Sequence, residues 1–181
     1  MRTARNSKVA KRYARALLGL SSETAQLETW GSELERLARI VAAPEISVAF
    51  ASPEVAPAAK IEALAKIGEK LEVSYPVRSF AAVVARHGRI EDLPAVAEAY
   101  RRMLDDLMGR ARATLTFPRA PAEDTLAGIL GGLEVIAHKK IIPTVNLDAA
   151  LIGGVVVELE GKTYDGSLAS RLAEAARRLA G

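Results

Sequence analysis

The residues that most suggest chemistry are Gly161, Lys162 and Thr163, because a phosphate-binding loop ends in glycine, lysine and serine or threonine. Such a loop also needs a glycine five positions before that final glycine and a helix directly after it. Here the earlier position is Val156, and the residues after Thr163 continue a strand-like pattern. The segment therefore predicts a two-residue hairpin turn at Gly161-Lys162 and not a nucleotide site.

No other group of side chains in the sequence makes a catalytic or metal-binding pattern. His87 and His138 are the only histidines, and neither has acidic residues at ligand spacing, which favours capping or surface roles. The neighbouring Asp105 and Asp106 are interpreted as part of a solvated helix face. The sequence also has no cysteine and no Gly-x-Ser-x-Gly motif. We therefore expect a protein that is not an enzyme and that uses no cofactor or metal.

The composition is typical of closely packed helices. Half of the 181 residues are apolar, only 4% are aromatic, and alanine is abundant. The longest uninterrupted apolar run, residues 149–157, is far shorter than the ~20 residues that a membrane-spanning helix needs. We expect a mainly helical chain that does not itself cross a bilayer.

Apolar residues three and four positions apart predict six helical segments before residue 109. Prolines open several of these segments, and Gly88 and Gly109 follow the last two as C-terminal caps. The predicted segments are 9–20, 27–41, 46–50, 57–71, 76–87 and 94–107. Together they predict an N-terminal six-helix bundle over residues 1–109.

The pattern changes at residue 110, where a small α/β domain is predicted over residues 110–181. The predicted elements of this domain are three strands, a short hairpin partner strand and a helix between the first two strands. That helix contains Gly128, Gly131 and Gly132, and each glycine destabilises a helix by about 1 kcal/mol relative to alanine. The predicted elements are strands 112–117, 141–147 and 154–160, a helix over 123–139 and a final helix capped by Ser167. The fold class is thus mainly α with a small α/β part.

Two surfaces are candidates for binding partners. Residues 1–15 hold six bases and no acid, whereas the rest of the chain has 19 bases against 22 acids. In the same helix Tyr13 lies one turn from the small Ala16, a pair that can leave a groove for a partner helix. The alternative is that Tyr13 is simply a core residue. The second surface is the hydrophobic C-terminal domain.

Three blocks of sequence, in order and at matching spacing, carry a family resemblance. They are Val-Ala-Lys-Arg-Tyr-Ala-Arg-Ala-Leu at 9–17, His-Gly-Arg-Ile-Glu-Asp-Leu-Pro at 87–94, and the long block from Leu151 to Leu168 that contains Gly-Gly-Val-Val-Val-Glu-Leu-Glu-Gly-Lys-Thr-Tyr-Asp-Gly. The chain resembles the delta subunits of F-type ATP synthases, whose mitochondrial counterpart is the oligomycin-sensitivity-conferring protein.

The resemblance implies a non-catalytic stator subunit. It implies that the helical domain binds the N-terminal helices of the alpha subunits, that the C-terminal domain binds the b subunits of the peripheral stalk, and that rotor torque is thereby resisted. The family's alpha-binding groove lies between its first and fifth helices, and the matching positions here are Tyr13, Ala16, Leu17, Ser79 and Val83. Because no presequence is recognised, we expect the cytoplasmic face of a bacterial inner membrane, reached only through the complex, with a mature chloroplast or mitochondrial form as the alternative.

Two other functions are compatible with the basic start of the chain. An arginine-rich first helix also resembles RNA-binding antitermination factors, for which affinity would fall steeply with salt. Against a nucleic-acid role, the other bases are balanced by acids and the α/β domain is unexplained. A lipid-surface protein is the third possibility, although the apolar side of the first helix is thin.

Overall fold

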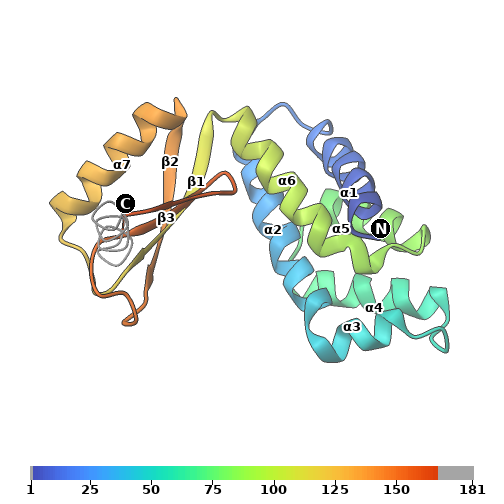
Figure 1. The fold of residues 1–181 in the computed structure, drawn as a ribbon. Coiled ribbons are helices and arrows are strands. Elements are labelled where there is room, and N and C mark those ends of the chain that lie inside the picture. The colour runs from blue at the N-terminus through green and yellow to red at the C-terminus, as the bar shows by residue number, and fades with distance from the viewer. Residues whose placement is uncertain (1, 167–181) are drawn as a thin grey trace. The chain divides into compact units, whose positions relative to one another are not determined.

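The computed structural model describes the backbone of residues 2–166 and the side chains of residues 8–166 (Figure 1). The chain divides into two compact units, an N-terminal unit of Met1–Leu104 and a C-terminal unit of Asp105–Gly181. The described elements are mainly helical with one small sheet, so the predicted fold class is confirmed at this level. The predicted final helix from Ser167 lies outside the described residues.

The described part of the N-terminal unit is helical throughout. Four of its helices, α3 to α6, begin with proline at the first or second position, where the missing N–H has no helical partner to lose. The elements are α1 (Arg2–Leu18), α2 (Thr24–Ala42), α3 (Pro44–Ala51), α4 (Pro57–Lys70), α5 (Tyr75–Arg86), the short 3-10 helix η1 (Ile90–Asp92) and α6 (Leu93–Leu107). The first helix thus begins seven residues before the predicted start at Val9.

A fully buried tyrosine ties α6 to α2 inside the N-terminal unit. The hydroxyl of Tyr100 donates a hydrogen bond to the carbonyl oxygen of Leu27 at 2.9 Å, and burial raises the pKa of Tyr100 to about 12. Gly31 lies against the same ring, where a Cβ atom would come within 3.2 Å of Cε1 of Tyr100. The small residue therefore lets α2 and α6 approach closely at this point.

The last turn of α6 carries two adjacent carboxylates with different surroundings. The side chain of Asp105 is only 8% exposed and accepts hydrogen bonds from Arg112, with the shorter one 2.6 Å long. Asp106 is exposed and pairs with Lys139, whose pKa is raised above its usual range by hydrogen bonds to Glu160 and to Asp106. The interpretation of Asp105 as a solvated residue is therefore wrong, because the neighbouring strand supplies arginines that pair with it.

The C-terminal unit is a four-stranded mixed sheet with one described helix. Its order is β2-β1-β3-β4, with β1 and β2 parallel and the other two pairs antiparallel. A parallel pair needs a crossover, and α7 provides it between β1 and β2. The elements are β1 (Arg110–Phe117), α7 (Glu123–Ala137), β2 (Lys140–Leu147), β3 (Val156–Leu159) and β4 (Lys162–Asp165).

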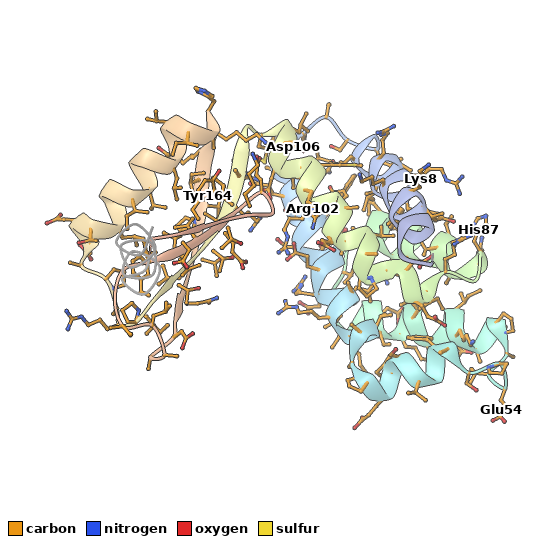
Figure 2. The ribbon with its side chains drawn as sticks, viewed as in Figure 1. Lys8, Glu54, His87, Arg102, Asp106 and Tyr164 are labelled. Carbon is orange, nitrogen blue, oxygen red and sulfur yellow. The ribbon has the colours of Figure 1, made fainter. Side chains whose placement is uncertain are left out.

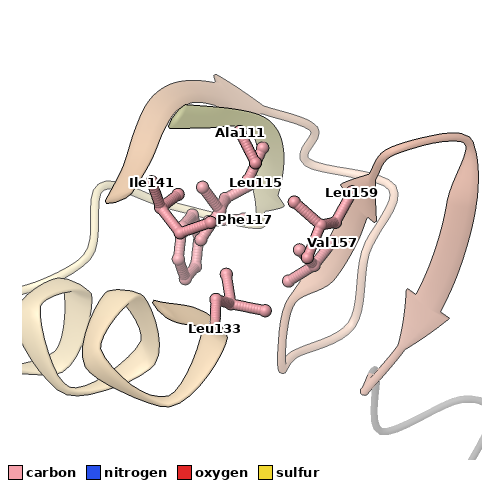
Figure 3. Packing of buried hydrophobic residues seen from close by; sticks show 8 residues of the cluster. Ala111, Leu115, Phe117, Leu133, Ile141, Val157 and Leu159 are labelled. Atoms are coloured by element: carbon pink, nitrogen blue, oxygen red, sulfur yellow. The ribbon is translucent and has the colours of Figure 1, made fainter. Parts of the chain in front are cut away.

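The core of this unit lies between α7 and one face of the sheet (Figure 3). Alternate residues of β1 are buried, as period-two side-chain alternation requires for a strand that buries one face. Leu133 of α7 packs among the buried residues of three strands. These buried residues are Ala111, Ala113, Leu115, Phe117, Ile141, Val157 and Leu159.

The hairpin between β3 and β4 turns one residue earlier than predicted. Its two central residues are Glu160 and Gly161, both in the left-handed region with φ of 50° and 81°, as a primed two-residue turn requires. Lys162 already pairs with Leu159 in the ladder. Since a strand follows Gly161 where a phosphate-binding loop needs a helix, the structure confirms that this motif is a hairpin.

Candidate partner-binding site

Helix α1 packs through a narrow apolar stripe and leaves one flank of that stripe uncovered. Ala10, Ala14 and Leu17 are buried, which follows from their spacing of four and three residues. Tyr13 is half-buried and Ala16 is exposed. The apolar stripe therefore extends beyond the part that the N-terminal unit covers.

Tyr13 connects α1 with α5 through its ring. The ring of Tyr13 meets that of Phe80 edge-on, with 6.3 Å between centroids, and lies 6.4 Å from the ring of His87. Edge-on aromatic pairs at this distance are favourable beyond the area they bury. In Figure 2, Lys8 of α1 and His87 after the end of α5 are labelled near one another on the N-terminal unit. Residues about 70 positions apart in sequence therefore form one surface.

Helix α5 ends with the glycine cap and the histidine cap that the sequence predicts. Gly88 has φ of 67° and its N–H donates to the carbonyl of Ala85, which is the expected glycine cap. The ring Nδ1 of His87 lies 2.8 Å from the carbonyl oxygen of Val83, so the histidine closes the last turn. This confirms the capping role expected for His87.

The structure separates the five predicted site residues into a surface set and a buried one. Ser79 is half-buried and Val83 is 43% exposed on α5, opposite the half-buried Tyr13 and the exposed Ala16 of α1. Leu17 is fully buried, so it supports this surface from within and offers no area to a partner. We call the surface of Tyr13, Ala16, Ser79 and Val83 the α1/α5 face; its role in binding stays a prediction.

Three further side chains on or just after α1 and α5 are exposed and were not among the predicted site residues. The first helix was predicted to run to residue 20, but α1 ends at Leu18 and Leu20 is 63% exposed. Tyr75 is 74% exposed at the start of α5, and Arg86 is exposed at its end. The type of an apolar residue does not show whether it is buried. The exposure of Leu20 and Tyr75 becomes clear only when the ends of α1 and α5 are known.

The C-terminal unit offers a different, mostly apolar surface. Val135 and Ile136 of α7 are 73% and 62% exposed, on the side of the helix that faces away from the sheet. An open cavity of about 840 Å³ lies near the start of α7, where Arg119 is the one charged side chain of its lining. The apolar lining residues are Phe117, Pro118, Ala120, Pro121, Ala122, Ile129, Ile152 and Val155.

The described residues form neither a metal-holding cluster nor a membrane-spanning helix. Within residues 8–166 no three histidine, cysteine, aspartate or glutamate side chains gather where a metal ion could be held. In that same part of the chain, no helix combines the length and apolarity needed to span a membrane.

Comparison with protein families and curated proteins gives one consistent result. The family model described as ATP synthase delta (OSCP) subunit matches residues 9–179. The chain is 32% identical over 166 residues to ATP synthase subunit delta of Citrifermentans bemidjiense, covering 91% of this chain and 92% of that one. It is 35% identical over 167 residues to the subunit of the same name from Nitratidesulfovibrio vulgaris, covering 91% of each.

A comparison of folds agrees. A chain in the cryo-EM structure of the Toxoplasma gondii mitochondrial ATP synthase hexamer matches with a TM-score of 0.66, covering 95% of this chain and 97% of that one. The sequence identity is 17%, so this likeness concerns the fold alone.

Proposed function

This chain belongs to the ATP synthase delta (OSCP) subunit family, and on that premise we propose that it links the catalytic head of the complex to its peripheral stalk. As a member of the family it is a structural subunit of an ATP synthase and not a catalytic one. A rotor that turns inside the head pushes the head round with it unless the head is held. A subunit that holds the head lets proton flow be coupled to ATP synthesis.

We assign the head contact to the N-terminal unit, whose six helices we propose to act as one bundle over residues 1–109. The observation that carries this assignment is the α1/α5 face, where an aromatic ring, a small residue and an exposed valine come from two adjacent helices. A partner helix laid between α1 and α5 would bury Tyr13 and Val83 and use the space beside Ala16 and Ser79. The proposed partners are the N-terminal helices of the alpha subunits.

We assign the stalk contact to the C-terminal domain over residues 110–181, with the b subunits as partners. Two separate apolar features of this unit support the assignment, namely the exposed Val135 and Ile136 of α7 and the cavity near the start of α7, because exposed apolar surface can mark a protein interface. The two contacts then lie on different units, as a connector requires.

We place the protein on the cytoplasmic face of a bacterial inner membrane, held there through the complex. Its similarity to subunits from bacteria supports the bacterial setting. No cofactor enters the proposed function, since both of its tasks are contacts between proteins.

The proposal is tested by binding both partners to the full chain. We expect the N-terminal segment of the alpha subunit and the soluble part of the b subunits to bind together, giving a ternary complex by light scattering after size exclusion. Replacing Ala16 by leucine should weaken alpha binding at least about tenfold, because the added side chain fills the space beside Tyr13. The same variant should bind the b fragment normally, which serves as an internal control for folding.

Ala63→Leu is the matched control, since Ala63 is also exposed in a helix of the N-terminal unit but lies on α4. Competition between the two partners would contradict the connector role. Undiminished alpha binding by Ala16→Leu would instead remove the α1/α5 face as the contact while leaving the connector role intact.

A further inference from the structure

The two helices that form the α1/α5 face contain no acidic residue. Helices α1 and α5 together carry eight arginines and lysines, six on α1 and two on α5. Removing these eight from the 25 bases of the chain leaves 17 bases against 22 acids. The positive net charge of the protein is therefore concentrated on these two helices.

The four described basic side chains on α1 follow one side of the helix and are exposed. Lys8, Lys11, Arg12 and Arg15 stand three and four positions apart, so they are neighbours on the helix surface. Like charges at this spacing destabilise an isolated helix. Such a stripe is thus unfavourable in the free protein and becomes favourable only when negative charge comes near it.

These bases also lack the ion pairs that some bases elsewhere in the N-terminal unit make. Among the described side chains, none of the four on α1 has an acidic partner within 4.0 Å, and the same holds for the exposed Arg86 of α5. By contrast, Lys66 pairs with Glu62 in α4, Arg101 of α6 with Glu35 of α2, and Arg102 with Glu98 in α6. Among the described side chains, Arg36 and Arg39 of α2 and Lys70 of α4 are also exposed without an acidic partner, but α1 differs in carrying four such bases as neighbours on one side of a helix.

The cationic stripe borders the apolar part of the face. The guanidinium carbon of Arg12 lies 5.9 Å from the centroid of the Tyr13 ring, close enough for a cation–π contact. Ala16, one turn beyond Arg12, is exposed next to it. Apolar area and positive charge therefore run in parallel along α1.

We propose that the α1/α5 face binds an amphipathic helix whose apolar side is flanked by acidic residues, and that these acids pair with the bases of α1. This inference rests on the proposed function, and it specifies the chemistry of the alpha-subunit segment that would occupy the face. A nucleic acid would bind the bases through its phosphates, but it would leave the apolar residues Tyr13 and Val83 of the α1/α5 face without a role. A lipid surface would need a broader apolar side than α1 presents.

Charged pairs at the rim of an interface act mainly on the association rate and on its salt dependence. We expect the affinity for the alpha segment to fall about tenfold between about 50 mM and about 500 mM salt, as each exposed pair weakens by a small factor. Binding should remain saturable at the higher salt, because apolar burial does not depend on screening.

The test uses the full chain and three probes: the alpha N-terminal peptide, the same peptide with its acids replaced by glutamine, and single-stranded poly(U). Titration calorimetry at both salt concentrations gives the affinities. The double variant Arg12→Gln/Arg15→Gln should bind the acidic peptide about tenfold more weakly at low salt and lose most of the salt dependence. The matched control is Arg36→Gln/Lys70→Gln, which removes the same net charge from exposed positions on α2 and α4.

The outcomes separate this inference from the function on which it rests. The inference is overturned if the neutralised peptide binds as tightly as the acidic one, or if both double variants weaken binding equally. If the alpha peptide fails to bind at either salt while the chain is folded by circular dichroism, the proposed head contact is itself wrong. Salt-sensitive binding of poly(U) in preference to the peptide would overturn both and favour nucleic acid.

Discussion

The same substitution should have opposite effects in two helices of this protein. Gly31 of α2 is buried against Tyr100 and Leu104, whereas Gly131 of α7 is exposed, and a Cβ added there would meet no other element within 4 Å. Replacing either glycine by alanine restricts the unfolded chain and improves helix propensity, which stabilises a helix by about 1 kcal/mol. The atoms around the added methyl group decide whether the alanine is stabilising overall.

At Gly31 the new methyl group would lie 3.2 Å from Cε1 of Tyr100 and 3.6 Å from Cδ2 of Leu104. The tyrosine ring cannot easily retreat, because it is fully buried and its hydroxyl is held at 2.9 Å by the carbonyl of Leu27. Overpacking of this kind costs about 1–3 kcal/mol. We therefore expect Gly31→Ala to lower the free energy of unfolding by up to about 2 kcal/mol, and Gly131→Ala to raise it by about 1 kcal/mol.

Each variant needs a probe of its own unit. The single tryptophan, Trp30, is buried next to Gly31, so its fluorescence in urea follows the N-terminal unit. Amide hydrogen exchange of α7 follows the C-terminal unit at Gly131. A stabilised Gly31→Ala, or a destabilised Gly131→Ala, would refute the reasoning from Cβ surroundings. Leucine in place of Tyr100 removes the ring, so in that background Gly31→Ala should lose most of its penalty.

Two further predictions concern buried polar groups. Because burial raises the pKa of Tyr100 to about 12 from about 10 in the unfolded chain, its stabilising effect is complete below pH 10 and is lost as pH rises towards 12. Urea unfolding followed by Trp30 from pH 9 upwards should show a steeper loss for the native chain than for Tyr100→Phe; equal slopes would contradict this. Asp105→Asn should destabilise the C-terminal unit by about 1–3 kcal/mol, because it removes the charge of a buried carboxylate that pairs with Arg112. The loss stays in this range because Arg112 is partly exposed and water screens the pair. The adjacent Asp106→Asn should cost less than about 1 kcal/mol, and equal exchange rates in β1 for the two variants would refute the difference.

The helices were predictable because local signals agreed with one another. Apolar spacing placed the helices, Pro57 and Pro76 stand at or near the first position of α4 and α5, and Gly88 takes the positive φ expected of a cap. These signals depend on a few neighbouring residues, so no knowledge of tertiary contacts is needed to read them. The strands were harder at their ends: β3 begins at Val156, two residues later than predicted, since Gly154 has φ of 86°.

Features that depend on distant partners were not readable from the sequence. The burial of Asp105 requires arginines placed by β1, and the close approach at Gly31 requires a tyrosine some 70 positions later. In sequence Gly31 and Gly131 are both glycines inside helices. Their different roles come entirely from how α2 meets α6 and how α7 meets the sheet.

The candidate site shows the same division between local and distant information. Spacing in α1 groups Tyr13 with Leu17, yet packing makes Leu17 a buried support and leaves Tyr13 half open, because α5 covers only one flank of the stripe. The pairing of α1 with α5 came from the family resemblance, since no local pattern says which helices are neighbours. The sequence shows that neither α1 nor α5 contains an acidic residue. This absence of acids indicates the charge of a binding partner only when the structure shows that the two helices are adjacent.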